Sequence, residues 1–248
     1  MENTEHGGTA ELGPGEVMDD LLHGELKLVQ HVKGYRYSVD ALLLAAFALP
    51  LADGKRVLDM GTGTGVVALI IACRATPIRV AAVEVQSSLA ALAQKNTAIN
   101  KTVPPVEVFD KDAMELEKIF PPDEFDLIVS NPPFRTSNSG RTSPLPEKAA
   151  ARHEVLMSLL PWLAQAKRVL APTGSICLVY PVDEEKRVMD TCAGLSLFPA
   201  RKQYATDRPD GRKRLFLVEL KAEKVETRLE PDVPIETDAG KFSLDGHK

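Results

Sequence analysis

Cysteine and tryptophan are scarce in this sequence, and their scarcity excludes several kinds of protein. The 248 residues include three cysteines and one tryptophan, and aromatic residues make up 5% of the total. Cys73, Cys177 and Cys192 are odd in number, far apart, and without a Cys-x-x-Cys pair. That pattern argues against a disulfide framework and a zinc site and favours a reducing compartment. We therefore expect no metal site.

Long hydrophobic runs are also missing. The longest, residues 41–52, is too short to span a bilayer and contains Pro50. A basic segment followed by an apolar stretch, as in a secretory signal, does not open the sequence. We expect a cytoplasmic protein without a membrane partner, acting as a monomer or homodimer.

Basic residues are absent from residues 1–26, although this segment carries seven Asp or Glu residues, and the net charge is −5. An acidic total speaks against a nucleic-acid partner, but the distribution of charge matters more than the sum. Basic side chains gather in two later segments, and we predict that they contact RNA phosphates: Arg135, Arg141, Lys148 and Arg152 in the first, and Arg201, Lys202, Arg212 and Lys213 in the second. The alternative is that these charges only solvate loops.

The apolar content, at 44% of residues, is enough for one large α/β domain. Short apolar runs alternate with helical patterns, which is typical of βαβ units and a mostly parallel sheet. We expect a flexible tail over residues 1–18, a hairpin and helix extension over 19–52, a catalytic domain over 53–221 and a C-terminal extension over 222–248.

The pattern predicts where each element lies. Strands are expected at residues 56–60, 79–85, 106–109, 125–130, 175–180, 198–205 and 214–221, the last two as an antiparallel pair around a turn at 208–212. Helices are expected at residues 66–73, 87–100 with Ser87 as N-cap, 113–120, 154–170 and 184–195. Residues 135–150 lack a pattern and are predicted to form a long loop.

A glycine-rich stretch, Asp59-Met-Gly-Thr-Gly-Thr-Gly65, follows the first strand of the predicted catalytic domain and precedes a helix. Glycines there bring the backbone close to a ligand where the sheet opens. A dinucleotide fingerprint requires Gly or Ala where this sequence has Val66. The loop therefore favours S-adenosylmethionine over NAD, and the predicted cofactor contacts in it are Asp59, Gly61, Thr62, Gly63 and Gly65. A tight turn without a ligand is the alternative.

Two acidic positions follow the next two strands. Glu84 ends the second strand, where a carboxylate can accept hydrogen bonds from both ribose hydroxyls of an adenosine group. Asp112 follows the third strand and could accept from the adenine amino group, with Asp110 as its rival. We include the neighbours Val85 and Ala113 in the predicted cofactor site, together with Asn131 after the fourth strand.

Asn131-Pro132-Pro133-Phe134, after the fourth strand, carries the predicted catalytic chemistry. An exocyclic amino nitrogen is a poor nucleophile because its lone pair is conjugated into the ring. Accepting its N–H groups, through the Asn131 side chain and the Pro132 carbonyl, favours the tetrahedral nitrogen of a methyl-transfer transition state. Phe134 offers a stacking face for the base. A proline turn that merely ends a buried strand is the alternative.

These motifs resemble, in order and spacing, those of class I S-adenosylmethionine-dependent methyltransferases that act on amino groups. Residues 20–30, 34–45 and 235–243 are similar to blocks of the bacterial tRNA(Val) adenine-N6 methyltransferase family. The resemblance implies a Rossmann-like class I fold with a mostly parallel seven-stranded sheet whose last strand is antiparallel. It also implies that residues 35–40, in particular Tyr37 and Asp40, help to close the cofactor pocket.

The activity that the resemblance implies is methylation of N6 of adenine 37 in the anticodon loop of a valine tRNA. Phe134 also occurs at this place in rRNA guanine-N2 methyltransferases, whereas many adenine enzymes carry Tyr, so guanine remains an alternative target. Protein-glutamine N5 methylation is a further alternative, because a glutamine amide presents the same NH2 group. A non-catalytic RNA-binding module on this fold is the alternative from another class.

Overall fold

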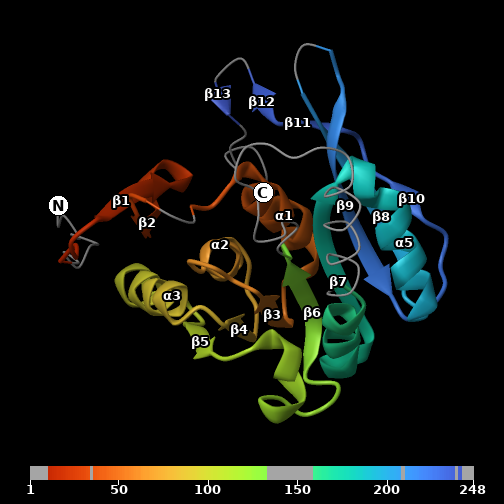
Figure 1. Ribbon diagram of the computed structural model, residues 1–248, viewed down its shortest axis with the longest axis horizontal. Coiled ribbons are helices and arrows are strands. Elements are labelled where there is room, and N and C mark those ends of the chain that lie inside the picture. The colour runs from red at the N-terminus through yellow and green to blue at the C-terminus, as the bar shows by residue number, and fades with distance from the viewer. Residues whose placement is uncertain (1–10, 34–35, 133–158, 208–209, 238–239, 242–248) are drawn as a thin grey trace, which may run out of the picture.

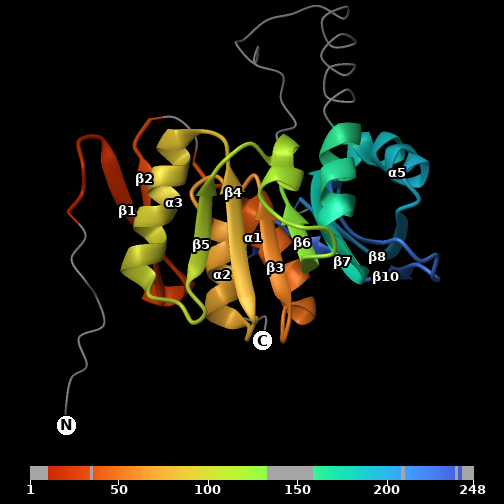
Figure 2. The same ribbon diagram turned by 90° about the horizontal axis from the view of Figure 1, so that it is seen from below.

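The protein, seen in a computed structural model, is an α/β structure with an N-terminal hairpin at one side (Figures 1 and 2). The structure describes residues 11–33, 36–132, 159–207, 210–237 and 240–241. The strands are β1 (Glu16–Leu21), β2 (Leu26–His31), β3 (Arg56–Met60), β4 (Arg79–Glu84), β5 (Val106–Asp110), β6 (Phe125–Ser130), β7 (Leu170–Pro181), β8 (Phe198–Thr206), β9 (Lys213–Lys221), β10 (Arg228–Leu229), β11 (Val233–Pro234), β12 (Glu236–Thr237) and β13 (Gly240–Lys241). The helices are α1 (Val39–Ala48), α2 (Val66–Arg74), α3 (Ser87–Asn100) and α5 (Glu185–Gly194), the short 3-10 helices η1 (Leu22–Gly24), η2 (Leu49–Leu51), η3 (Ala113–Lys118) and η4 (Val182–Glu184), and helical residues 159–169.

The main sheet has the strand order β10-β8-β9-β7-β6-β3-β4-β5. Strands β5, β4, β3, β6 and β7 pair in parallel, whereas β9 is antiparallel to both β7 and β8. From β3 the chain builds outward through β4 to β5 and then returns to form β6 on the other side of β3. This reversal makes the carboxyl ends of β3 and β6 the switch point, where ligands bind in open α/β sheets.

Two hydrophobic cores cover the two faces of the sheet. Successive residues of β3 show why, because Val57 packs with α1 and α2 in one core and Leu58 packs in the other with residues of helical segment 159–169 and α5. Side chains of a strand alternate between faces, so both sets are apolar when both faces are buried. Figure 1 shows α1 and α2 on one side of the sheet and α5 on the other.

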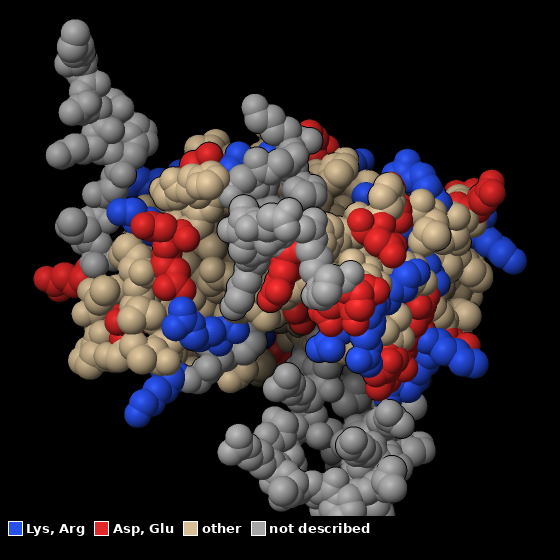
Figure 3. All heavy atoms as spheres, turned by 90° about the horizontal axis from the view of Figure 1, so that it is seen from above, with Lys and Arg blue, Asp and Glu red and all other residues tan. Residues whose placement is uncertain are grey.

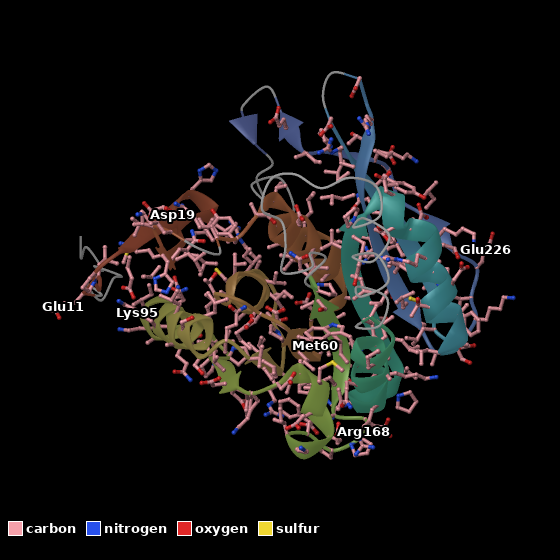
Figure 4. All side chains as sticks on the ribbon, viewed as in Figure 1. Glu11, Asp19, Met60, Lys95, Arg168 and Glu226 are labelled. Atoms are coloured by element: carbon pink, nitrogen blue, oxygen red, sulfur yellow. The ribbon has the colours of Figure 1, made fainter. Side chains whose placement is uncertain are left out.

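The N-terminal hairpin of β1 and β2 docks on α3 through apolar contacts and two asparagines. Val29 packs against Leu89 and Leu92. The Asn96 side chain pairs with the backbone of Val29, accepting from its N–H at 2.7 Å and donating to its carbonyl at 3.0 Å, and Asn100 does the same for Lys27. These side chains therefore act as a partner for one edge of β2. Lys95, labelled in Figure 4, adds a hydrogen bond to the Glu11 carbonyl at 2.6 Å.

The predicted seven-stranded sheet with an antiparallel last strand is confirmed, and it gains two short edge strands. β10 and β11, from the segment expected to be a C-terminal extension, both pair with β8. The expected boundary between residues 18 and 19 lies within β1, which is paired with β2 from Glu16 onward. The hairpin therefore begins earlier than the charge pattern indicated.

Several expected element ends were wrong. The helix predicted at 113–120 is only the 3-10 helix η3, with non-helical angles at Glu115. Gln86, not Ser87, is the N-cap of α3, and the Ser87 hydroxyl instead donates to Asp110 at 3.2 Å. Strand β7 begins at Leu170, five residues before the expected start at Ser175. The predicted loop at 135–150 lies outside the described residues.

Candidate active site at the carboxyl edge of the sheet

The glycine loop between β3 and α2 bends sharply toward β4. Gly61, Gly63 and Gly65 have φ values of +78°, +60° and +87°, which favour glycine because a Cβ is strained there. The N–H groups of Gly61 and Thr62 donate to the carbonyl of Val83 at 2.9 and 3.0 Å. The loop is thus tied to the end of β4, and its backbone faces the space beyond the strands.

Asp59 lies beneath this loop and supports it from inside. Its carboxylate accepts hydrogen bonds from the Thr62 hydroxyl at 2.5 Å and the Ala68 N–H at 3.1 Å, and its side chain is buried. Burial raises the pKa of Asp59 to about 7, the two hydrogen bonds oppose that rise, and the charge of Glu84 adds to it. Asp59 and Thr62, predicted as cofactor contacts, therefore shape the loop and do not line the cavity beside it.

Glu84, at the end of β4, faces the glycine loop. Its two carboxylate oxygens accept from the N–H of Gly63 and the N–H of Gln86, both at 2.9 Å, and the residue is 6% exposed. Each oxygen has two lone pairs, so each keeps the capacity to accept another hydrogen bond. The two backbone contacts fix the orientation of the carboxylate at the end of β4.

A cavity of about 200 Å³ opens between the ends of β3, β4 and β6. Seven of the predicted cofactor residues line it, namely Gly61, Gly63, Glu84, Val85, Asp112, Ala113 and Asn131. Asp112 also caps η3 by accepting from the Met114 N–H at 2.8 Å, whereas its rival Asp110 does not line the cavity. The structure thus favours Asp112 over Asp110 for the role suggested by the sequence.

Four lining residues were missed by the sequence analysis, namely Val83, Gln86, Leu89 and Trp162. The first three lie within five residues of Glu84, so extending the predicted site along the chain would have found them. Trp162 comes from the helical segment after the motif at 131–134, and only the folded chain brings it back to Gly61. Being the single tryptophan of the chain was its one signal.

Asn131 follows β6 and lines the cavity across from Glu84. The preceding residue, Ser130, is buried, and its hydroxyl donates to the Met60 carbonyl at 2.7 Å and accepts from the Trp162 indole N–H at 3.1 Å. Pro132 is buried. Pro133 and Phe134 lie outside the described residues.

The remaining predicted cofactor residues make contacts elsewhere in the fold. Tyr37 is half-buried against the core that contains α1, and burial raises the pKa of its hydroxyl. Its backbone N–H donates to the side chain of buried Gln30 at 3.0 Å. Asp40 lies in the first turn of α1, and Gly65 packs close to Ala93 of α3. None of the three lines the cavity among the described residues.

The predicted RNA contacts in the second basic segment differ in how exposed they are and in what they contact. Arg201 is 7% exposed, pairs with Glu219 at 3.1 Å, donates to the Phe47 carbonyl at 2.6 Å and stacks on the Phe47 ring. A guanidinium used in this way is not available to a phosphate, so its predicted RNA role is corrected to a structural one. Lys202 is paired with Glu185 at 2.7 Å.

Two members of this segment lie nearer the edge that carries the cavity, because β8 ends and β9 begins there. Arg212 is exposed, and Lys213 is exposed with its ammonium over the Tyr204 ring. In the face shown in Figure 3, the basic and acidic side chains of the described residues are interspersed. The first basic set, Arg135, Arg141, Lys148 and Arg152, lies outside the described residues.

Neither a metal-ligand cluster nor a membrane-spanning helix is present in the part of the chain that the structure describes. No three His, Cys, Asp or Glu side chains there lie close enough to hold a metal ion. No helix there is both long and apolar enough to cross a bilayer.

Comparisons with known proteins agree with this architecture. A model of the methyltransferase small domain matches residues 38–193. A protein of Parabacteroides distasonis named tRNA1(Val) (adenine(37)-N6)-methyltransferase is 32% identical over 84% of this chain and 86% of its own length. A protein of the same name from Aeromonas hydrophila is 37% identical over 59% of each chain.

Solved structures share the fold at low sequence identity. TYW2 of M. jannaschii in complex with AdoMet has a TM-score of 0.58 at 13% identity, covering 86% of this chain and 89% of its own. The ribosomal protein L11 methylase of Lactobacillus delbrueckii has a TM-score of 0.56 at 17% identity, covering 78% and 91%. At these identities the likeness shows the fold alone.

Proposed function

We propose that this chain, which belongs to the methyltransferase small domain family, transfers a methyl group from S-adenosylmethionine to N6 of adenine 37 in tRNA1(Val). The observation that carries the proposal is the placement of Asn131 across one small cavity from Glu84 and the glycine loop. A cofactor site and an amine-binding site then share one opening. Several relatives that carry the tRNA1(Val) (adenine(37)-N6)-methyltransferase name support the choice of substrate.

The residues around the cavity fit the cofactor. Glu84 presents two carboxylate oxygens with spare lone pairs to ribose hydroxyls, and exposed Asp112 presents an acceptor to an adenine amino group. Gly61 and Gly63 line the cavity with backbone atoms alone, since neither has a side chain. When bound, S-adenosylmethionine supplies a methyl group on a cationic sulfur.

Asn131 would orient the accepting amine. Its side-chain oxygen and the Pro132 carbonyl can each accept one N–H of an exocyclic amino group. Holding both hydrogens favours the tetrahedral nitrogen, on which the lone pair becomes free to attack. With S-adenosylmethionine held by Glu84, Asp112 and the glycine loop, the cofactor would supply the methyl group to the amine that Asn131 and Pro132 orient, and the amine would give up one proton to solvent.

Phe134 and the basic set at residues 135–152 remain predictions for base stacking and phosphate contact. Arg212 and Lys213 are proposed to contact the tRNA backbone because both are exposed near the cavity edge. A tRNA substrate also accords with the cytoplasmic location expected from the sequence.

The decisive experiment measures methyl transfer to tRNA and identifies the product nucleoside by mass spectrometry. The wild-type protein should form N6-methyladenosine in tRNA1(Val), and Asn131→Ala should lower turnover by about 100-fold or more while leaving cofactor affinity within a few-fold. Asn100→Ala, a change of the same kind far from the cavity, is the matched control and should turn over normally.

Parallel incubations with rRNA and with release factors test the alternative substrates. Methylated guanine in rRNA or methylated glutamine would replace the adenine assignment. Normal turnover by Asn131→Ala would remove Asn131 from the proposed role. Failure of the wild-type protein to bind S-adenosylmethionine, measured by calorimetry, would favour a non-catalytic module.

A further inference from the structure

A short chain of hydrogen bonds joins the two strands on either side of the switch point. The β3–β6 ladder pairs Val57 with Leu127, Leu58 with Ile128 and Asp59 with Val129, and it stops there. The next residues, Met60 and Ser130, are joined by the Ser130 hydroxyl, which donates to the Met60 carbonyl at 2.7 Å. Met60 is labelled among the central strands in Figure 4. A side chain thus continues the strand pairing at the point where the two strands separate.

The direction of this hydrogen bond is set by Trp162. An indole N–H only donates, and it donates to the Ser130 oxygen at 3.1 Å. The serine hydroxyl has one hydrogen, so this hydrogen is free to point to the Met60 carbonyl. Ser130 is 1% exposed, which keeps water from replacing either of its two hydrogen bonds. The result is a directed chain from Trp162 through Ser130 to Met60.

The indole ring also contacts the glycine loop. A Cβ built on Gly61 would lie 3.2 Å from two carbons of the Trp162 ring, so the ring packs directly on this glycine. Gly61 follows Met60 and Asn131 follows Ser130, and both line the cavity with Trp162. One rigid side chain therefore touches the loop on the cofactor side and is hydrogen-bonded to the residue that precedes Asn131.

We propose that Ser130 and Trp162 are positioning residues that set the separation between the glycine loop and the Asn131 amide. The inference rests on the proposed function, in which the cofactor lies against the loop and the amine lies against Asn131. Methyl transfer needs the two reacting atoms in line at close range, and a misplacement of about 1 Å can lower the rate on the order of 100-fold. Neither residue touches the reacting atoms in this account, since each acts through the position of Asn131.

The test compares Ser130→Ala, Trp162→Phe and the double variant by steady-state kinetics with tRNA. Each single variant should lose about 10- to 100-fold in kcat, because the separation is no longer held. In Ser130→Ala, whose side chain does not line the cavity, the KM for tRNA and the cofactor Kd should change by less than about 3-fold, because the groups that bind them remain. The double variant should lose no more than the poorer single variant, since both changes break the same chain. Ser130→Thr keeps a hydroxyl and should recover most of the lost turnover.

Lys167→Met is the matched control for damage to the helical segment. Lys167 anchors the same segment by donating to the Leu195 carbonyl at 2.5 Å, away from the cavity. This variant should be less stable but should keep its kcat. Because Trp162 is the only tryptophan, its emission reports the hydrogen bond directly, and Ser130→Ala should shift that emission to shorter wavelength.

The outcomes separate this inference from the proposed function. A wild-type protein without methyl transfer to any tRNA contradicts the proposed function. An active wild type with an equally active Ser130→Ala overturns the positioning role, as do additive losses in the double variant. A loss confined to KM also overturns it, because positioning acts on the bound complex.

Discussion

Asn96 joins three parts of the molecule, and its replacement by alanine tests how the hairpin is held on the catalytic domain. Its side chain is fully buried and makes three hydrogen bonds with backbone groups. Two of them go to Val29 of β2, and the third goes from the amide nitrogen to the Thr64 carbonyl in the glycine loop at 2.9 Å. Asn96→Ala would leave one N–H and two carbonyls without these partners.

The expected loss of stability follows from the burial of those groups. An unsatisfied buried polar group costs about 1–3 kcal/mol, with carbonyls toward the low end because they have two lone pairs. The sum for Asn96→Ala is roughly 3–5 kcal/mol before relaxation, and about 3 kcal/mol after partial relaxation and water entry. Such a loss is a large share of the roughly 5–15 kcal/mol that stabilises a folded protein.

Asn100 offers an internal control on the same helix. It makes the same pair of contacts with the backbone of Lys27, at 2.8 and 2.7 Å, but in an exposed setting where water can replace it. Asn100→Ala should therefore cost only about 0.5–1 kcal/mol.

Urea denaturation followed by circular dichroism measures both variants against the wild type. The free energy of unfolding should fall about 2 kcal/mol further for Asn96→Ala than for Asn100→Ala, at an unchanged m-value. Calorimetry should also show weaker cofactor binding for Asn96→Ala, because the glycine loop loses a support at Thr64. Equal losses of stability in the two variants would refute the reasoning, since burial would then have no effect on how much these hydrogen bonds contribute to the free energy of unfolding.

Three further predictions concern single residues near the sheet. The pKa of Asp59 is higher in the folded protein than in the unfolded chain, so protonation of its carboxyl favours folding. This contribution to the free energy of unfolding, up to about 4 kcal/mol, should be lost as pH rises from about 4 to 7. Asp59→Asn should lack that pH dependence when both proteins are denatured at several pH values, and parallel curves would contradict the raised pKa. Gly61→Ala should cost roughly 1–3 kcal/mol and weaken cofactor binding, because φ is +78° and the new Cβ meets Trp162; unchanged stability and unchanged tryptophan emission would count against that contact. Arg201→Met should lower stability by about 3 kcal/mol, because the buried Glu219 carboxylate would keep only the Ser175 hydroxyl at 2.8 Å and the more distant Lys221 ammonium at 3.8 Å, and tRNA affinity should not change. A normal unfolding curve with weakened tRNA binding would instead restore the predicted phosphate role.

Local pattern was sufficient for the central strands and for the residues that follow them. The alternation of apolar runs with helical segments determined the parallel sheet, because strands buried on both faces are continuously apolar. Gly61, Glu84, Asp112 and Asn131 were found because each lies at the end of such a strand or within two residues after it. Parallel strands end at the same edge, so their order along the chain was enough to place these residues together.

Tertiary structure alone decided which of the charged and polar residues support the site and which face it. Asp59 has the sequence position of a ligand contact, yet the loop folds over it, and Thr62 and Ala68 both donate to one oxygen of its buried carboxylate. Arg201 looks basic and available in the sequence but is buried against Glu219. Trp162 reaches Gly61 only because the chain returns across the sheet, since contacts between distant segments leave no mark on local periodicity.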